Sequence, residues 1–204
     1  MRRWRLSVRV KPAKAARIEF FCGGSGMGKT TALLCRIAGA PRVLAWDMKG
    51  EFSRDHGFER VAGVDLYERL RAGAGRIAVT SHDPKHFEHF CTLAFWWGNC
   101  AVVAEELADV TRPGKAPLEW GKVLRRGRDR SLSVFAVSQR PTECDTTIFG
   151  LRTYTAAFYL PRANDRAYMA RELDADRRRL DALKPYQFLE RNGNAGARLV
   201  KLLG

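Results

Sequence analysis

A short glycine-rich segment carries the residue types and the spacing of a phosphate-binding loop. Residues 23–30 fit the pattern GxxxxGK[ST] in full, between an apolar run and a helix-like run. Glycines let a backbone curl so that its N–H groups point at phosphate oxygens. In this pattern Lys29 reaches the β- and γ-phosphates, the Thr30 hydroxyl ligates Mg²⁺, and Thr31 contacts the α-phosphate. The residues expected around the triphosphate are Gly23, Gly24, Ser25, Gly26, Met27, Gly28, Lys29, Thr30 and Thr31.

Two adjacent carboxylates follow another apolar run. Cys100–Ala104 has the length of a buried strand, and Glu105 and Glu106 come directly after it. A carboxylate at the end of a neighbouring strand can hold the water shell of Mg²⁺, and a second one can take a proton from attacking water. Because successive side chains of an extended strand point to opposite sides, we expect Glu105 on the metal side, acting through water, and Glu106 as the general base.

A glutamine and an arginine-rich run flank a third apolar strand, Leu132–Ser138. Gln139 at the tip of this strand can sense the γ-phosphate or orient the water, and the alternative is a polar residue that starts a turn. The run Arg-Arg-Gly-Arg-Asp-Arg lies just before the strand. In a ring of subunits an arginine there can stabilise charge on a neighbour's γ-phosphate, with Arg128 ahead of Arg125; the alternative is contact with DNA phosphate or solvent.

Apolar runs and helical patterns alternate along the chain. Strands are expected at Arg17–Cys22, Arg42–Trp46, Arg76–Thr80, Cys100–Ala104, Leu132–Ser138 and Thr153–Leu160. Helices are expected at Lys29–Ala38, Asp65–Ala72, Pro84–Trp97, about Ala116–Gly127 and within 163–183. A hairpin signal, Asn-Gly-Asn, separates the last two apolar runs. This order predicts an α/β fold with a mainly parallel sheet, helices on both faces and a C-terminal β-hairpin.

Length and charge narrow the classes of protein. The 204 residues suit one sizeable core, so we expect a basic N-terminal arm or edge strand over 1–16 and a single ATPase domain over 17–204. Thirty-six Lys and Arg against 22 Asp and Glu give a net charge of +14, which favours a polyanionic partner, most often nucleic acid; a basic solvated surface is the alternative. No apolar run approaches the roughly 20 residues of a membrane helix, so no membrane segment is expected.

Together these features resemble the FtsK–HerA superfamily of DNA-pumping ATPases, over about Arg17 to Arg191. The resemblance rests on the loop GGSGMGKT, the segment WDMKGEF after the second strand, VVAEE, and RRGRDRSLSVFAVSQRP. The small size is most similar to the viral genome-packaging ATPases of tailless, membrane-containing icosahedral viruses. Two departures stand out: Glu105 replaces an aspartate, and Ser131 stands where the family often has glycine.

The resemblance implies a P-loop NTPase of the additional-strand, catalytic-glutamate class that hydrolyses ATP with Mg²⁺. It implies a ring of identical subunits, expected to be a hexamer, that moves double-stranded DNA and packages a viral genome into a preformed capsid. A capsid vertex or membrane protein would be a further partner, in the host cytoplasm or at the virion vertex. Lys29 and Thr30 carry over as phosphate and Mg²⁺ residues, Glu106 as the catalytic acidic residue, Gln139 as the sensor and Arg128 as the arginine finger.

Three other functions stay open at this point. A related ATPase that drives filamentous-phage assembly or export usually has a membrane segment. A P-loop nucleotide kinase needs an acceptor pocket and an arginine-bearing lid, whereas strand ends at Glu105, Glu106 and Gln139 favour hydrolysis. A non-catalytic, nucleotide-dependent DNA-binding module would bind ATP without releasing phosphate.

Overall fold

The computed structural model describes residues 17–73 and 75–202. The expected basic arm over residues 1–16 lies outside the described residues. The strands are β1 (Ile18–Cys22), β2 (Arg42–Trp46), β3 (Glu59–Arg60), β4 (Gly75–Val79), β5 (Ala101–Ala104), β6 (Ser133–Ser138), β7 (Tyr154–Phe158), β8 (Gln187–Asn192) and β9 (Arg198–Lys201). The helices are α1 (Lys29–Ile37), α2 (Glu51–Asp55), α3 (Leu66–Arg71), α4 (Pro84–Trp97), α5 (Leu107–Val110), α6 (Leu118–Arg126), α7 (Thr146–Leu151), α8 (Ala163–Leu173) and α9 (Arg177–Asp181). Two 3-10 turns are η1 (Gly127–Arg130) and η2 (Pro141–Glu143).

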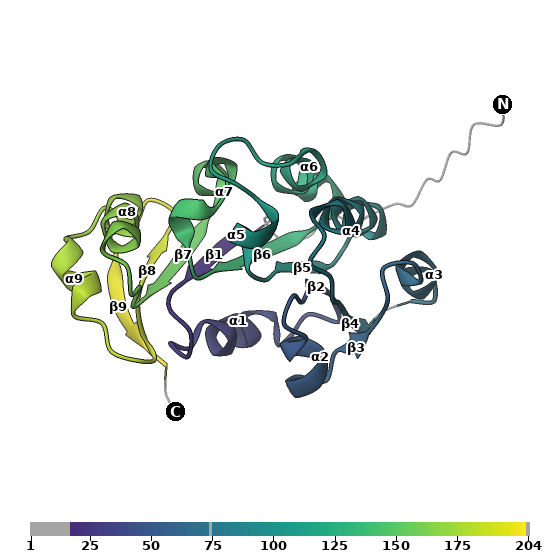
Figure 1. Ribbon diagram of the computed structural model, residues 1–204, viewed down its shortest axis with the longest axis horizontal. Coiled ribbons are helices and arrows are strands. Elements are labelled where there is room, and N and C mark those ends of the chain that lie inside the picture. The colour runs from purple at the N-terminus through teal and green to yellow at the C-terminus, as the bar shows by residue number, and fades with distance from the viewer. Residues whose placement is uncertain (1–16, 74, 203–204) are drawn as a thin grey trace.

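Within the described residues the strands form one nine-stranded sheet in the order β3-β4-β2-β5-β6-β1-β7-β8-β9 (Figure 1). Neighbours from β3 through β7 run parallel, and β7–β8 and β8–β9 are antiparallel. The predicted α/β fold, with its mainly parallel sheet and C-terminal hairpin, is therefore confirmed. β6 lies between β5, which the two glutamates follow, and β1, which the glycine loop follows. This extra strand between β5 and β1 is the arrangement expected for the additional-strand class.

Helices cover both faces of the sheet and bury two apolar cores. Figure 1 shows α1 and α2 on one face and α4, α6 and α7 on the other. Alternation along β1 directs Phe20 to the face of α7, where its ring centroid lies 4.9 Å from that of Phe149. The next residue, Phe21, points to the face of α1 and packs with Leu33 and Ile37 in the second core. Both cores fix the sheet as a rigid platform for the loops at its carboxyl edge.

Helix starts follow local capping chemistry. The Asp83 side chain accepts a hydrogen bond from the Lys85 backbone N–H at 2.8 Å, and Pro84 occupies the first turn of α4. Asp145 accepts from Ile148 N at the start of α7 in the same way. The sequence pattern did not predict α2 and β3, since α2 buries only Phe52 and β3 is two exposed residues.

Among the described residues no helix is long and apolar enough to cross a membrane.

Candidate active site

The glycine-rich loop joins β1 to α1, as the motif predicts. Gly23 N donates to Ser138 O at 3.3 Å and Gly24 N to Tyr159 O at 2.8 Å, so the ends of β6 and β7 anchor the loop's first turn. Gly28 has a φ of +103° at the start of α1, a left-handed conformation that favours glycine. A Cβ at Gly23 would lie 2.6 Å from the Phe158 Cβ. The glycines are therefore required by backbone conformation and close approach.

Lys29 spans this loop from its first helical position. Its Nζ donates to Gly24 O at 2.8 Å, and only 7% of the residue is exposed. Burial lowers the pKa of Lys29, while the nearby Glu106 carboxylate acts in the opposite direction. The ammonium group is thus held over the curled backbone, at the position where the motif requires a cation.

Glu106 occupies the junction between β5 and α5 and is 8% exposed. Its Oε1 accepts two hydrogen bonds, each 2.8 Å long, from Lys49 Nζ and from Gln139 Nε2. β5 ends at Ala104, as the sequence predicted, but the extended backbone assumed for the alternation of the two glutamates was wrong, because Glu106 has a φ of +47°. Left-handed backbone at a residue other than glycine is strained, and such strain concentrates at functional sites. The structure still brings Glu106 and Gln139 into direct contact, as the strand ends suggested.

Glu105 lies deeper than Glu106 and is 4% exposed. Burial, reinforced by the negative charge of Glu51, raises the pKa of Glu105 to about 8. Its Oε2 is buried without a hydrogen-bond partner within the described residues, and Thr30 lines the same pocket. An orphaned carboxylate oxygen and a hydroxyl in one pocket are oxygen ligands of the kind that suits a hard cation such as Mg²⁺.

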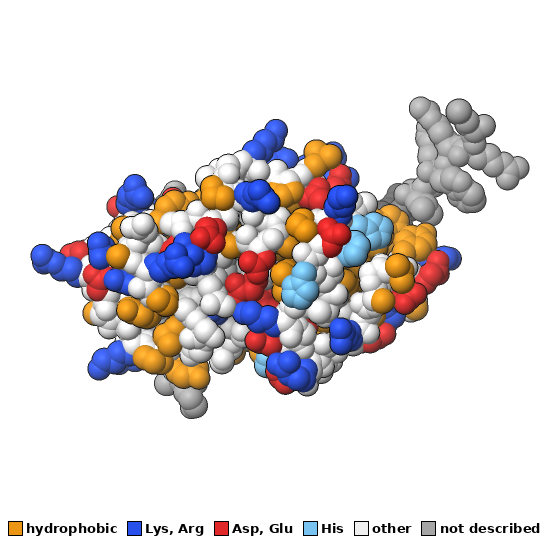
Figure 2. Space-filling model, in the orientation of Figure 1, with side chains coloured by type: hydrophobic (Ala, Val, Ile, Leu, Met, Phe, Trp, Pro, Cys, Tyr) orange, Lys and Arg blue, Asp and Glu red, His pale blue; other side chains and the backbone are white. Residues whose placement is uncertain are grey.

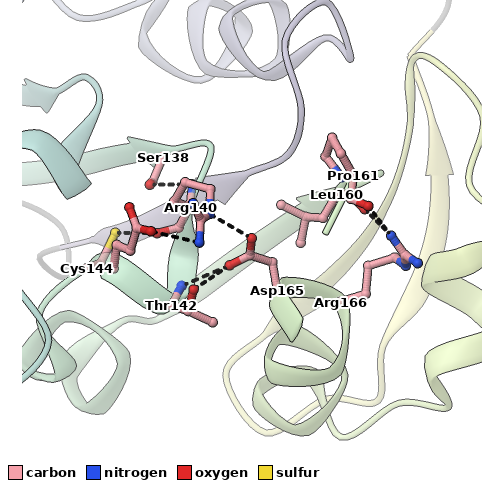
Figure 3. Close-up of polar contacts among 9 residues, drawn as sticks. Ser138, Arg140, Thr142, Cys144, Leu160, Pro161, Asp165 and Arg166 are labelled. Atoms are coloured by element: carbon pink, nitrogen blue, oxygen red, sulfur yellow. Dashed lines mark hydrogen bonds and ion pairs between the residues drawn. The ribbon is translucent and has the colours of Figure 1, made fainter. Parts of the chain in front are cut away.

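The turn that follows Gln139 in the chain is held by Asp165, whose contacts with Arg140 and Thr142 are drawn in Figure 3. Asp165, 1% exposed in the first turn of α8, accepts from Arg140 Nε at 2.9 Å and from Thr142 Oγ1 at 2.6 Å. Arg140 also pairs with Glu143 at 2.7 Å. A buried carboxylate with a paired guanidinium is costly to break from either side, so this network fixes the turn that positions Gln139.

Helix α8 also supports the glycine-rich loop, through the segment that contains Leu160 and Pro161. Arg166, one residue after Asp165, donates to the carbonyls of Leu160 and Pro161 at 2.6 and 2.8 Å (Figure 3). The Pro161 Cδ would lie 3.2 Å from a Cβ at Gly24. α8 therefore braces both the turn at Gln139 and the loop, and this connection is absent from any local sequence pattern.

The arginine-rich run lies at the amino end of β6, whereas the glycine loop lies at the carboxyl end of the neighbouring parallel strand β1. η1 precedes β6, whereas Gln139 follows it, so Arg128 and Gln139 are separated by the whole strand. The Arg128 side chain is exposed and makes no hydrogen bond or ion pair within the part of the chain that the structure describes. Ser131 ends η1 with a φ of +54°, a conformation that explains why glycine suits this position. The structure does not bring Arg128 to the loop of its own subunit.

The glycine loop and the acidic strand end share one pocket of 290 Å³. Its lining is Ser25, Gly26, Gly28, Lys29, Thr30, Thr31, Lys49, Glu51, Glu105, Glu106, Gln139 and Tyr186. A larger cavity of 640 Å³ lies beside β4 and α4, where His86 and His89 meet apolar side chains. Among the described residues that line it, none is a carboxylate or belongs to the glycine loop. The predicted residues of the glycine loop and of the two strand ends therefore gather in the smaller pocket.

Three residues of this pocket were not predicted as site residues: Lys49, Glu51 and Tyr186. Lys49 belongs to the segment after β2, whose Lys-Gly-Glu sequence was an available signal, but pairing with Glu106 requires the tertiary fold. Tyr186 precedes β8 and has no motif around it that points to the loop. The structure brings Lys49 and Glu51 to the pocket from one side of β1 in the sheet order, and Tyr186 from the other side.

Comparison with known proteins finds one similar protein in sequence and several in structure. The chain is 34% identical over 173 residues to protein P9 of Pseudoalteromonas phage PM2, covering 79% of this chain and 77% of the phage protein. No family model matches the chain.

Two solved structures illustrate the similarity of fold. The genome packaging NTPase B204 from Sulfolobus turreted icosahedral virus 2, in complex with AMPPCP, superposes with a TM-score of 0.76 at 16% identity, over 92% of this chain and 98% of that one. The pCW3 conjugation coupling protein TcpA gives a TM-score of 0.60 at 13% identity, over 91% of this chain and 60% of that one. These similarities confirm the P-loop NTPase fold and the expected resemblance to packaging NTPases.

Glu105→Gln should raise the melting temperature above that of the wild type, by a margin that grows from pH of about 6 to about 9. The pKa of Glu105 in the folded protein, about 8, exceeds its ordinary value of 4.5. A raised carboxyl pKa stabilises the fold fully below the unfolded pKa, and this contribution is lost as the pH rises through the folded pKa. Glutamine cannot ionise, so the variant escapes that loss.

Thermal unfolding without nucleotide or Mg²⁺ checks this prediction, and Glu68→Gln on exposed α3 is the control. A margin that stays constant over this pH range would contradict the raised pKa.

Proposed function

The chain belongs to the same family as protein P9 of Pseudoalteromonas phage PM2, and from this premise we propose that it is an ATP-hydrolysing motor that packages a viral genome. The observation that carries the proposal is the pair of 2.8 Å hydrogen bonds that aim the Glu106 carboxylate into the pocket of Lys29 and Thr30. A fixed carboxylate beside a triphosphate loop supports hydrolysis, because it can accept a proton from water.

Different residues of the pocket bind the phosphates, position the water and accept its proton in the proposed hydrolysis. Backbone N–H groups of residues 25–28 and the Lys29 ammonium would hold the β- and γ-phosphates of ATP, and Thr31 the α-phosphate. The oxygen of a water positioned by Gln139 attacks the γ-phosphorus, and its proton passes to Glu106. The bond between the γ-phosphorus and the bridging oxygen breaks, so ADP and phosphate leave.

Mg²⁺ would be held by Thr30 and, through water, by Glu105. When bound it neutralises charge on the β- and γ-phosphate oxygens. Glu105 is longer than the usual aspartate, and such a shell would satisfy its buried Oε2, which has no hydrogen-bond partner among the described residues.

Double-stranded DNA is the proposed substrate of the motor. The net charge of +14 supports a polyanionic partner. Figure 2 shows Lys and Arg side chains at several places on the visible face, with Asp and Glu side chains between them. The B204 structure belongs to a genome-packaging NTPase, which favours this role over a filamentous-phage export ATPase. We place the protein in the host cytoplasm or at the virion vertex, with a vertex or membrane protein of the capsid as a further partner.

A ring of identical subunits, expected to be a hexamer, completes the site in this proposal. The Arg128 side chain is exposed and has no hydrogen bond or ion pair within the described chain, and it lies before β6, at the opposite end of that strand from the loop. As an arginine finger it would reach the γ-phosphate of the neighbouring subunit and stabilise charge in the transition state.

Double-stranded DNA should raise the ATPase rate severalfold. The stimulation and the binding of DNA should both fall steeply with salt, since phosphate contacts release counterions. Phosphate release is measured with and without DNA, alongside the mass of the protein in solution, and Lys29→Ala is the inactive control. ATP turnover by a monomer that DNA leaves unchanged would argue for a different P-loop ATPase, and phosphate transfer to a nucleotide acceptor would argue for a kinase.

Mixing Arg128→Ala with Lys29→Ala subunits should restore part of the ATPase activity that each variant lacks alone. The mixed assembly contains interfaces where an intact loop meets an intact Arg128, so those sites can turn over. Mixed assemblies are verified by native mass spectrometry before the rate is measured. Equal mixtures that contain both variants and show no recovery would exclude Arg128 as a finger acting between subunits.

A further inference from the structure

A tyrosine borders the loop on the side away from Glu106. Glu106 follows β5, whereas Tyr186 precedes β8, and the loop strand β1 lies between these two in the sheet order. In Figure 1, α1 accordingly lies between α2 and the β8–β9 hairpin. One end of the pocket is therefore formed by Lys49, Glu106 and Gln139, and the other end is formed by Tyr186.

The backbone of Tyr186 is tied directly to the loop. Its N–H donates to Met27 O at 3.0 Å, and its carbonyl accepts from Leu202 N at 2.9 Å. The ring leans over Gly28, where a Cβ would lie 2.9 Å from the Tyr186 Cδ1. Hydrogen bonds on both sides therefore fix the backbone from which this side chain projects.

The conformation of Tyr186 is unusual for its residue type. Gln187 N donates to Lys184 O at 3.0 Å, which closes a turn with Pro185 second and Tyr186 third. Tyr186 has a φ of +61°. Proline second and positive φ third is the pattern of a type II turn, whose third residue is ordinarily glycine or asparagine. A bulky side chain in this place costs stability, so the turn itself does not account for a tyrosine.

Packing does not account for the tyrosine either. Tyr186 is 52% exposed, and within residues 17–73 and 75–202 its hydroxyl makes no hydrogen bond. An aromatic ring buries large area when it serves a core, and its hydroxyl then has a partner. A strained, half-exposed ring at the mouth of a polar pocket instead offers a flat apolar face to a ligand.

We infer that Tyr186 is the platform on which the base of the bound nucleotide stacks, with a purine preferred. This inference rests on the proposed function, which places a triphosphate over the loop. The groups at Glu106 fix the γ-phosphate end, and Thr31 receives the α-phosphate, so the nucleoside leaves the loop toward Tyr186. Ring and base then meet face to face, and the larger purine surface gains more from stacking.

Two probes separate the base from the phosphates: ATP, and inorganic tripolyphosphate, which has the phosphates without a base. Tyr186→Gly removes the ring and suits a positive φ, and Tyr186→Phe keeps the ring and removes the hydroxyl. Isothermal titration should show that Tyr186→Gly binds ATP about tenfold more weakly and tripolyphosphate unchanged. Tyr186→Phe should match the wild type with both probes. The wild-type preference for ATP over UTP should shrink in Tyr186→Gly.

Other outcomes overturn the assignment. Unchanged ATP affinity in Tyr186→Gly would show that the ring does not bind the base. An equal loss for ATP and tripolyphosphate would show that it shapes the loop, and a loss in Tyr186→Phe would assign the effect to the hydroxyl. If Tyr186→Gly does not fold, Tyr186→Asn replaces it, because asparagine also tolerates this conformation.

The controls distinguish this inference from the proposed function. Lys29→Ala should weaken both probes whatever the role of Tyr186. A wild type that binds neither probe would refute the triphosphate site, and the platform with it. A wild type that binds both probes and hydrolyses ATP, beside a Tyr186→Gly variant with unchanged affinities, would refute the platform alone.

Discussion

The parallel register of β5, β6 and β1 is the constraint on which the site depends. Ala104 pairs with Ala136, and Cys22 pairs with Ser138, so all three strands end near one level of the sheet. The glycine loop, the acidic pair and Gln139 each begin where one of these strands stops. A slip of one residue in any pairing would move every side chain of that strand to the other face of the sheet and separate these groups. The two cores that fix the sheet therefore also fix the positions of the loop, the acidic pair and Gln139.

The charges of the pocket account for the different surroundings of its two carboxylates, Glu105 and Glu106. Lys29 and Lys49 face Glu106 and Glu105 in a half-enclosed space, where each unpaired charge would be costly. Glu106 is satisfied by two donors from the segments that follow β2 and β6, while Glu105 keeps an oxygen without a partner within the described residues. One carboxylate is therefore oriented for a proton and the other is available to a cation.

The sequence predicted the parts of this site that depend on local chemistry. Lys29 and Thr30 follow from the glycine pattern, and Glu106 and Gln139 from their places at strand ends. The left-handed backbone of Glu106 was not predictable, because strand alternation assumes extended residues. Asp165 and Tyr186 were missed since each reaches the site through contacts between distant segments. Arg128 was predicted as a finger between subunits, and a single chain does not test that role.

ATP binding and hydrolysis by Glu106→Gln, measured on the same preparation, test the central claim most directly. The amide preserves the size of the side chain and removes the proton acceptor, so ATP affinity should stay within a few fold of the wild type. Hydrolysis should fall by about a hundredfold or more, which is the usual contribution of a general base. A variant that binds ATP normally and hydrolyses it at the wild-type rate would contradict the account.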